Sequence, residues 1–180
     1  ALPRRSSVED LRQENYADLV RSGQSMMWRA GELIHLNSCY APTVDDELIP
    51  EHPIAAFENG HQHQVPLLIG TNSDEASFGK FLFQRQSSRE RAALRLLASF
   101  DPQHAPEVVA AYDGAVARED FAHLLADALF WAPSTRIASA HAQAAPTWMY
   151  RFDYASAVLK WLGLGAMHSM ELGNVFGDPY

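Results

Sequence analysis

The most constraining stretch of this 180-residue sequence is a short apolar run that passes directly into a polar turn. Residues 65–69 read VPLLI, Gly70 follows them, and residues 71–75 read TNSDE. An apolar run of this length that stops at a glycine predicts a β-strand buried on both faces. Such a strand is stable only inside a sheet covered by other elements, so the sequence requires a layered fold around it.

A second strand is predicted at residues 147–153, where aromatic side chains occupy alternate positions. Capping residues and apolar spacing predict helices at 54–59, 89–99, 107–112, 119–131 and 135–144. Pro133 is expected to end the fourth of these helices, and Ser134 to cap the fifth. A capping box formed by Ser7 and Asp10 predicts one more helix near the start. Strands that alternate with helices favour an α/β fold with a mostly parallel sheet.

The composition argues against several classes of protein. With 14 Lys and Arg against 22 Asp and Glu, the net charge is −8, which opposes binding to nucleic-acid phosphates. No apolar run approaches the roughly 18 residues of a membrane span. The single cysteine, Cys39, excludes an internal disulfide and a multi-cysteine zinc site, and we expect its thiol to be inert. Together with the lack of an Asn-x-Ser/Thr site, this favours an intracellular location.

Two polar side chains follow the predicted strands, at the edge of a sheet where ligands usually bind. Glu75 lies in the turn after the first strand, and His168 lies in a glycine-flanked loop after the second. A carboxylate and a histidine on separate strand-end loops suggest a general base and its orienting acid. Two other interpretations stay open: Asp74 and Glu75 could stabilise a helix N-terminus through its dipole, and His168 could be purely structural. Glu171, three residues after His168, fits a supporting position beside the histidine.

A nucleophile is not recognisable in these 180 residues. The Gly-x-Ser-x-Gly elbow of α/β-hydrolases is absent, because the one pair of glycines at that spacing, Gly173 and Gly177, encloses Val175. A glycine-rich oxyanion segment is also absent. His61 and His63 form a possible metal-binding pair, but two histidines without a third ligand are usually surface residues.

Four stretches and four single residues stand out together: 40–50 (YAPTVDDELIP), 65–78 (VPLLIGTNSDEASF), 150–153 (YRFD) and 165–177 (GAMHSMELGNVFG), with Asp127, Phe130, Pro133 and Arg136. In this order they resemble the type-B carboxylesterases, which are cholinesterase-like α/β-hydrolases. The chain departs from the family at Asp46, Ala76 and Ser169, each of which stands where a glycine is common. These departures fall in turns and leave the acid and the histidine unchanged.

The resemblance implies a partial α/β-hydrolase fold and a Ser-His-Glu triad. Glu75 matches the acid of that triad and His168 matches the general base. Asp74 and Glu171 would support these two residues. In the family, the serine and the oxyanion glycines precede this segment, so they have no counterpart here.

The resemblance also implies how the chain is used. Residues 1–180 would be a fragment of a single α/β-hydrolase domain, truncated at both ends and inactive in isolation. The parent protein would hydrolyse small-molecule carboxylic esters without a cofactor or a metal. The expected partners are the missing N-terminal half of the same protein or a second copy of the chain, and neither a nucleic acid nor a membrane. The alternative is a non-catalytic binding or adhesion module of the cholinesterase-like type.

Overall fold

The computed structural model of the chain describes residues 7–27 and 42–177. The chain divides into two compact units, residues 1–43 and residues 44–180, and each is described by itself. The assignment of all 180 residues to a single domain stays a prediction. Cys39 lies outside the described residues, so the inertness of its thiol also stays a prediction.

The first unit contains two helices, α1 (Val8–Gln13) and α2 (Tyr16–Met27). The predicted capping box at the start of α1 is confirmed. The Asp10 N–H donates to Ser7 Oγ at 3.1 Å, and the Ser7 N–H donates to the Asp10 carboxylate at 2.8 Å. These bonds satisfy backbone donors that have no partner inside the helix, which fixes where α1 begins.

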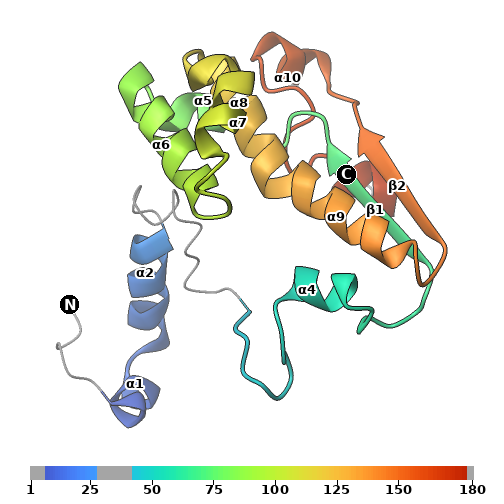
Figure 1. The fold of residues 1–180 in the computed structure, drawn as a ribbon. Helices are drawn as coiled ribbons and strands as arrows, with labels where there is room; N and C mark the ends of the chain where they lie inside the picture. Colours follow the sequence, from blue (N-terminus) through green and yellow to red (C-terminus); the bar gives the residue numbers. More distant parts are fainter. Residues whose placement is uncertain (1–6, 28–41, 178–180) are drawn as a thin grey trace. The chain divides into compact units, whose positions relative to one another are not determined.

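The second unit is built on two parallel strands, β1 (Leu67–Asn72) and β2 (Thr147–Phe152). Their first residues lie opposite each other, as do their last residues, and Figure 1 shows the two arrows side by side. Parallel strands need a long crossover connection, and residues 73–146 provide it with a series of helices. The predicted α/β class with parallel strands is confirmed.

The prediction for residues 65–69 is wrong in two respects. The strand begins at Leu67, after a proline that has no N–H to donate, and it continues through residues 71 and 72 instead of turning at Gly70. It is also not buried on both faces, because Leu68 is 67% exposed and Trp148, opposite it on β2, is 57% exposed. The opposite face of this pair of strands is covered by helices along its length.

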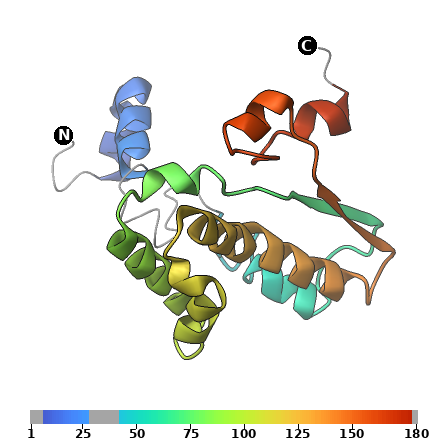
Figure 2. The same ribbon diagram turned by 90° about the horizontal axis from the view of Figure 1, so that it is seen from above.

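That covered face packs against α9 (Ala132–His141), and α4 (Pro53–Glu58) packs against α9 in turn. Figure 2 shows α9 running along the two strands with α4 beside it. The buried ring of His141, at the end of α9, meets the Val65 carbonyl with Nε2 at 2.7 Å. This hydrogen bond fixes the end of the helix to the chain just before β1.

Five further helical segments of the crossover form a separate layer of the unit. They are α5 (Gly79–Leu82), α6 (Gln86–Ala98), α7 (Ala105–Ala111), the 3₁₀ turn η1 (Asp113–Ala115) and α8 (Arg118–Ala126). Their most buried large side chains are Leu96, Phe121 and Leu124. Helix α6 begins three residues before the predicted start at Arg89, because the N–H groups of Ser88 and Arg89 already bond to the Arg85 carbonyl.

The expected break at Pro133 does not occur. A π-helical turn, η2 (Asp127–Trp131), joins α8 directly to α9, and Pro133 lies in the first turn of α9. Proline is tolerated there because the π-helical turn just before it already departs from the usual i→i−4 hydrogen-bond pattern. In that wider turn the Ala132 N–H donates to the Asp127 carbonyl, five residues earlier. Ser134 is consequently inside α9 and caps no helix.

Two short helices follow β2, namely α10 (Ala157–Trp161) and α11 (Leu172–Phe176). Both are five residues long, which is too short for an apolar periodicity to predict them. The loop between them carries His168. In the described part of the chain, no helix has the length and apolar character needed to cross a membrane.

Candidate active site

The structure brings Glu75 and His168 together, although 93 residues separate them in the sequence. Glu75 lies in the turn after β1 and is 6% exposed, whereas the side chain of His168 is 54% exposed. Glu75 Oε2 lies 2.7 Å from His168 Nδ1, and Glu75 Oε1 accepts the Asn72 N–H at 2.8 Å. An ionised carboxylate can only accept, so Nδ1 carries the proton. In the neutral ring, Nε2 is then a free base.

The ring of His168 is also held by an aromatic contact. The ring of Phe130, in the π-helical turn η2, lies 4.9 Å from the imidazole between centroids, with an interplanar angle of 40°. The hydrogen bond to Glu75 constrains one edge of the imidazole, and the ring of Phe130 packs against the imidazole ring. Nε2 makes no hydrogen bond within residues 7–27 and 42–177, and the ring is half open to solvent.

Asp74 fixes the loop of His168 to the turn of Glu75. The Asp74 N–H donates to the Ala166 carbonyl at 3.1 Å, and the Ala166 N–H donates to the Asp74 carboxylate at 3.0 Å. Ser73 Oγ donates to the same carboxylate at 2.7 Å. The alternative of a helix-dipole role receives no support, because α5 starts at Gly79 without a side-chain cap and both carboxylates bond elsewhere.

Glu171 lies near the histidine but bonds to a different residue. Its Oε2 accepts from Asn72 Nδ2 at 2.5 Å, and the same Nδ2 donates to the Met167 carbonyl at 2.8 Å. Sequence reasoning missed Asn72, which was grouped with the polar turn after the strand. Its one available signal was its place among the polar residues at the carboxyl end of the strand.

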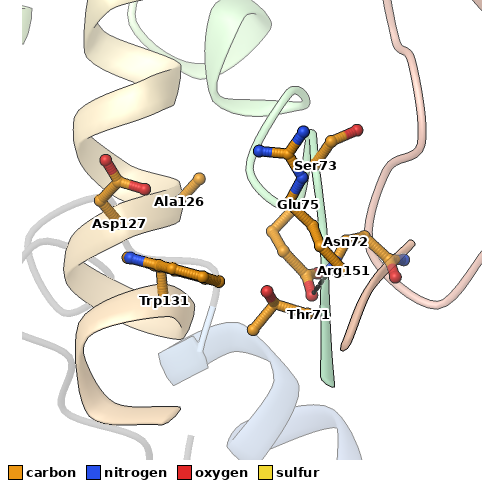
Figure 3. A pocket seen from close by; sticks show the side chains of 8 residues that line it. All are labelled: Thr71, Asn72, Ser73, Glu75, Ala126, Asp127, Trp131 and Arg151. Carbon is orange, nitrogen blue, oxygen red and sulfur yellow. Dashed lines mark hydrogen bonds between the residues drawn. The ribbon is translucent and has the colours of Figure 1, made fainter. Parts of the chain in front are cut away.

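A pocket of about 280 Å³ lies beside the acid. Its walls come from the end of β1 and its turn, from β2, and from the helix side: Thr71, Asn72, Ser73, Glu75, Ala126, Asp127, Trp131 and Arg151. Figure 3 shows Asp127 and Trp131 on the helix, facing the side chains of the strand. Asp127 accepts a hydrogen bond of 2.5 Å from the Tyr112 hydroxyl. Burial, and then this interaction with Asp127, raises the pKa of Tyr112 from 10.0 to about 12.

The possible metal pair of the sequence is not assembled into a larger group. His61 bonds through Nδ1 to Glu51, and in the described ranges no three His, Cys, Asp or Glu side chains lie close enough to hold a metal ion.

In comparison with known proteins, residues 3–180 match the model of the carboxylesterase family. The chain belongs to the carboxylesterase family. It is 34% identical over 142 residues to para-nitrobenzyl esterase of Bacillus subtilis (strain 168), covering 77% of this chain and 28% of that protein. It is 26% identical over 169 residues to pyrethroid hydrolase Ces2a of Mus musculus, covering 82% of this chain and 30% of that protein.

Solved structures of carboxylesterases share the fold. A structure of PNB esterase superposes with a TM-score of 0.73 and 29% identity, covering 94% of this chain and 35% of that chain. The second unit is therefore part of an α/β-hydrolase fold. The chain spans about a third of the length of the carboxylesterases it matches.

Two of the three departures from the glycines common in carboxylesterases fall at left-handed backbone positions. Asp46 has a φ of +61° and Ser169 a φ of +69°. These positions favour glycine because a Cβ atom is strained there, whereas Ala76 has no positive φ. Ser169 follows His168 directly, so the chain holds its histidine loop in a conformation that its own sequence disfavours.

The first prediction concerns Gly165, whose φ is +60° and whose added Cβ would lie 2.3 Å from the Asp74 carboxylate. We expect Gly165→Ala to lower the free energy of unfolding by about 2 to 4 kcal/mol, from backbone strain and the steric clash together. Urea unfolding of the chain measures this.

Gly163→Ala is the matched control, because Gly163 has a φ of +69° but no atom within 4 Å of an added Cβ. Its cost should be that of the backbone alone, about 1 kcal/mol. Equal costs for the two variants would show that the Gly165 backbone and Asp74 are not in close contact.

The second prediction concerns Tyr112. Because the native state binds the phenol proton more tightly than the unfolded chain, the raised pKa stabilises the fold fully below pH 10 and ceases to do so as the pH rises through about 12. Tyr112→Phe should cost on the order of 1 kcal/mol at pH 8 and less above pH 10. Unfolding of both proteins across this pH range measures the difference. A difference that stays constant with pH would contradict the assignment.

Proposed function

We propose that this chain carries the acid and the base of a carboxylic ester hydrolase whose nucleophile is a serine outside these 180 residues. The observation that carries the proposal is the buried Glu75 carboxylate bonded to Nδ1 of the half-exposed His168. Membership of the carboxylesterase family supports the same reaction class.

Each residue has one role in the proposed reaction. His168 Nε2 takes the proton of the serine hydroxyl as that oxygen attacks the ester carbonyl, and later returns a proton to the leaving alcohol. Glu75 keeps the proton on Nδ1 and stabilises the imidazolium that forms between these steps. Asp74 and Glu171 hold the two loops in place. None of these steps needs a metal or a cofactor.

The proposed substrate is a small-molecule ester. The names of two relatives support this: para-nitrobenzyl esterase is named for an ester, and pyrethroid hydrolase for the hydrolysis of a small molecule. Between Glu75 and Asp127, the 280 Å³ pocket has room for a group of small size, and Trp131 gives it one apolar wall.

The third prediction tests the two catalytic roles. In the full-length polypeptide that contains this chain, Glu75→Gln and His168→Ala should each lower kcat by about 10³-fold or more, because the first disturbs the tautomer and the second removes the base. Steady-state hydrolysis of p-nitrophenyl butyrate measures both. The exposed residues Glu47 and His63 provide matched controls as Glu47→Gln and His63→Ala, which should leave kcat unchanged.

Near-normal turnover in Glu75→Gln or His168→Ala would contradict the proposed roles of these two residues. A wild-type full-length polypeptide that hydrolyses no ester would favour the non-catalytic binding module. The chain of 180 residues alone should be inactive and should form no adduct with a serine-directed fluorophosphonate. Intact-mass spectrometry of the treated chain measures this. An adduct would place the nucleophile inside these residues.

We also propose that the chain associates through its open strands, either with the complementary segment of the esterase or with a second copy of itself. Leu68 and Trp148 leave apolar surface exposed, and each strand of the described pair has one unpaired edge.

The fourth prediction follows from this exposed surface. In dilute solution, the chain should have a mass of at least twice 20.0 kDa in sedimentation experiments. Leu68→Lys should shift it toward the monomer by placing a charge on the open face. A wild-type monomer at micromolar concentration would rule out self-association.

A further inference from the structure

We infer that the side-chain amide of Asn72 is the device that positions the His168 loop on the acid turn, an inference that rests on the proposed function. Asn72 is the last residue of β1 and is 5% exposed. Its side-chain amide bonds to the loop of His168 and not to the imidazole ring, so it acts as a positioning residue.

Asn72 bonds both to the proposed acid, Glu75, and to the loop that carries the proposed base, His168. Its backbone N–H donates to Glu75 Oε1 at 2.8 Å, which fixes the carboxylate whose other oxygen meets His168. Its Nδ2 donates to the Met167 carbonyl at 2.8 Å and to Glu171 Oε2 at 2.5 Å. Met167 directly precedes His168 and Glu171 follows three residues later, so one amide group holds the loop on both sides of the histidine.

The chemistry of this position calls for an asparagine. Both partners of Nδ2 are acceptors, so the amide orientation is settled by the contacts themselves. The two N–H bonds of the NH₂ group match the two acceptors, whereas an aspartate offers no donor and a serine or threonine offers one. Asn72 also lies between two carboxylates, Glu75 and Glu171, and donates to each of them. The residue therefore allows two negative groups to flank the histidine without facing each other unpaired.

The loop needs this restraint because one of its residues has a strained backbone conformation. Ser169 is held at a φ of +69°, a conformation that a non-glycine residue adopts only when its surroundings impose it. Asp74 holds the loop at Ala166, before the histidine, and Asn72 is the contact that reaches Glu171, beyond Ser169. Without the amide, we expect His168 to lie less often in line with Glu75, which lowers the rate of the chemical step without changing the binding of the ester.

The fifth prediction is a kinetic series in the full-length esterase. Asn72→Ala should lower kcat for p-nitrophenyl butyrate by about 10- to 100-fold while KM changes less than about twofold, because misplacement of a catalytic group affects the transition state. Asn72→Asp should be at least as impaired, since it places a new carboxylate against that of Glu171, in addition to Glu75. Adding Glu171→Gln to Asn72→Asp exchanges the donor and the acceptor, and should restore at least fivefold of the lost kcat.

Asn174→Asp is the matched control, because Asn174 is exposed on α11 and the same change of charge occurs near the loop. It should keep the wild-type kcat. A second measurement is the low-field proton resonance of His168 Nδ1–H, which should be present in the wild type and in Asn174→Asp and weakened or lost in Asn72→Ala. If Asn72→Ala fails to fold, the comparison of Asn72→Asp with its double variant decides.

The inference fails if Asn72→Ala keeps the wild-type kcat, or if the double variant recovers nothing over Asn72→Asp. The proposed function fails separately, if Glu75→Gln and His168→Ala remain active. Inactive Glu75 and His168 variants together with a fully active Asn72→Ala would leave the esterase assignment intact and overturn the role of Asn72 alone.

Discussion

The hydrogen bond between Glu75 and His168 is the interaction on which the rest of the site depends. It joins a turn after β1 to a loop after β2, and the parallel pairing of the two strands brings those segments to the same edge. The bond is useful only if the carboxylate stays buried while the imidazole stays accessible. The observed exposures, 6% and 54%, meet both conditions.

The end of β1 contributes to both the pocket and the support of this bond. Thr71 and Asn72 both line the pocket, and the amide of Asn72 also bonds to the loop that carries His168. Glu75, three residues further on, touches both regions. The helix side contributes Phe130 against the imidazole ring, so the acid and the base are each held by groups from different elements.

How much of this was predictable depends on whether a feature has a local cause. The strand β2, the capping box at Ser7, and the meeting of Glu75 with His168 follow from patterns within a few residues or from the rule that strand ends share an edge. The passage through Pro133 was not predictable, because proline begins helices as well as ending them and a π-helical turn has no sequence signature. The role of Asn72 was hidden because its side-chain partners lie 95 and 99 residues away.

The pairing of β1 with β2 has a consequence for how the molecule forms. Leu67 pairs with Thr147, so the contact closes a loop of 147 − 67 = 80 residues. Loops of that size lose much chain entropy on closure, and folds dominated by such distant pairs form slowly. The helices between the strands can form from local contacts first, and the two halves of the candidate site meet only after they do. During synthesis on a ribosome, Glu75 is therefore made about 93 residues before His168, and it has no histidine partner in that interval.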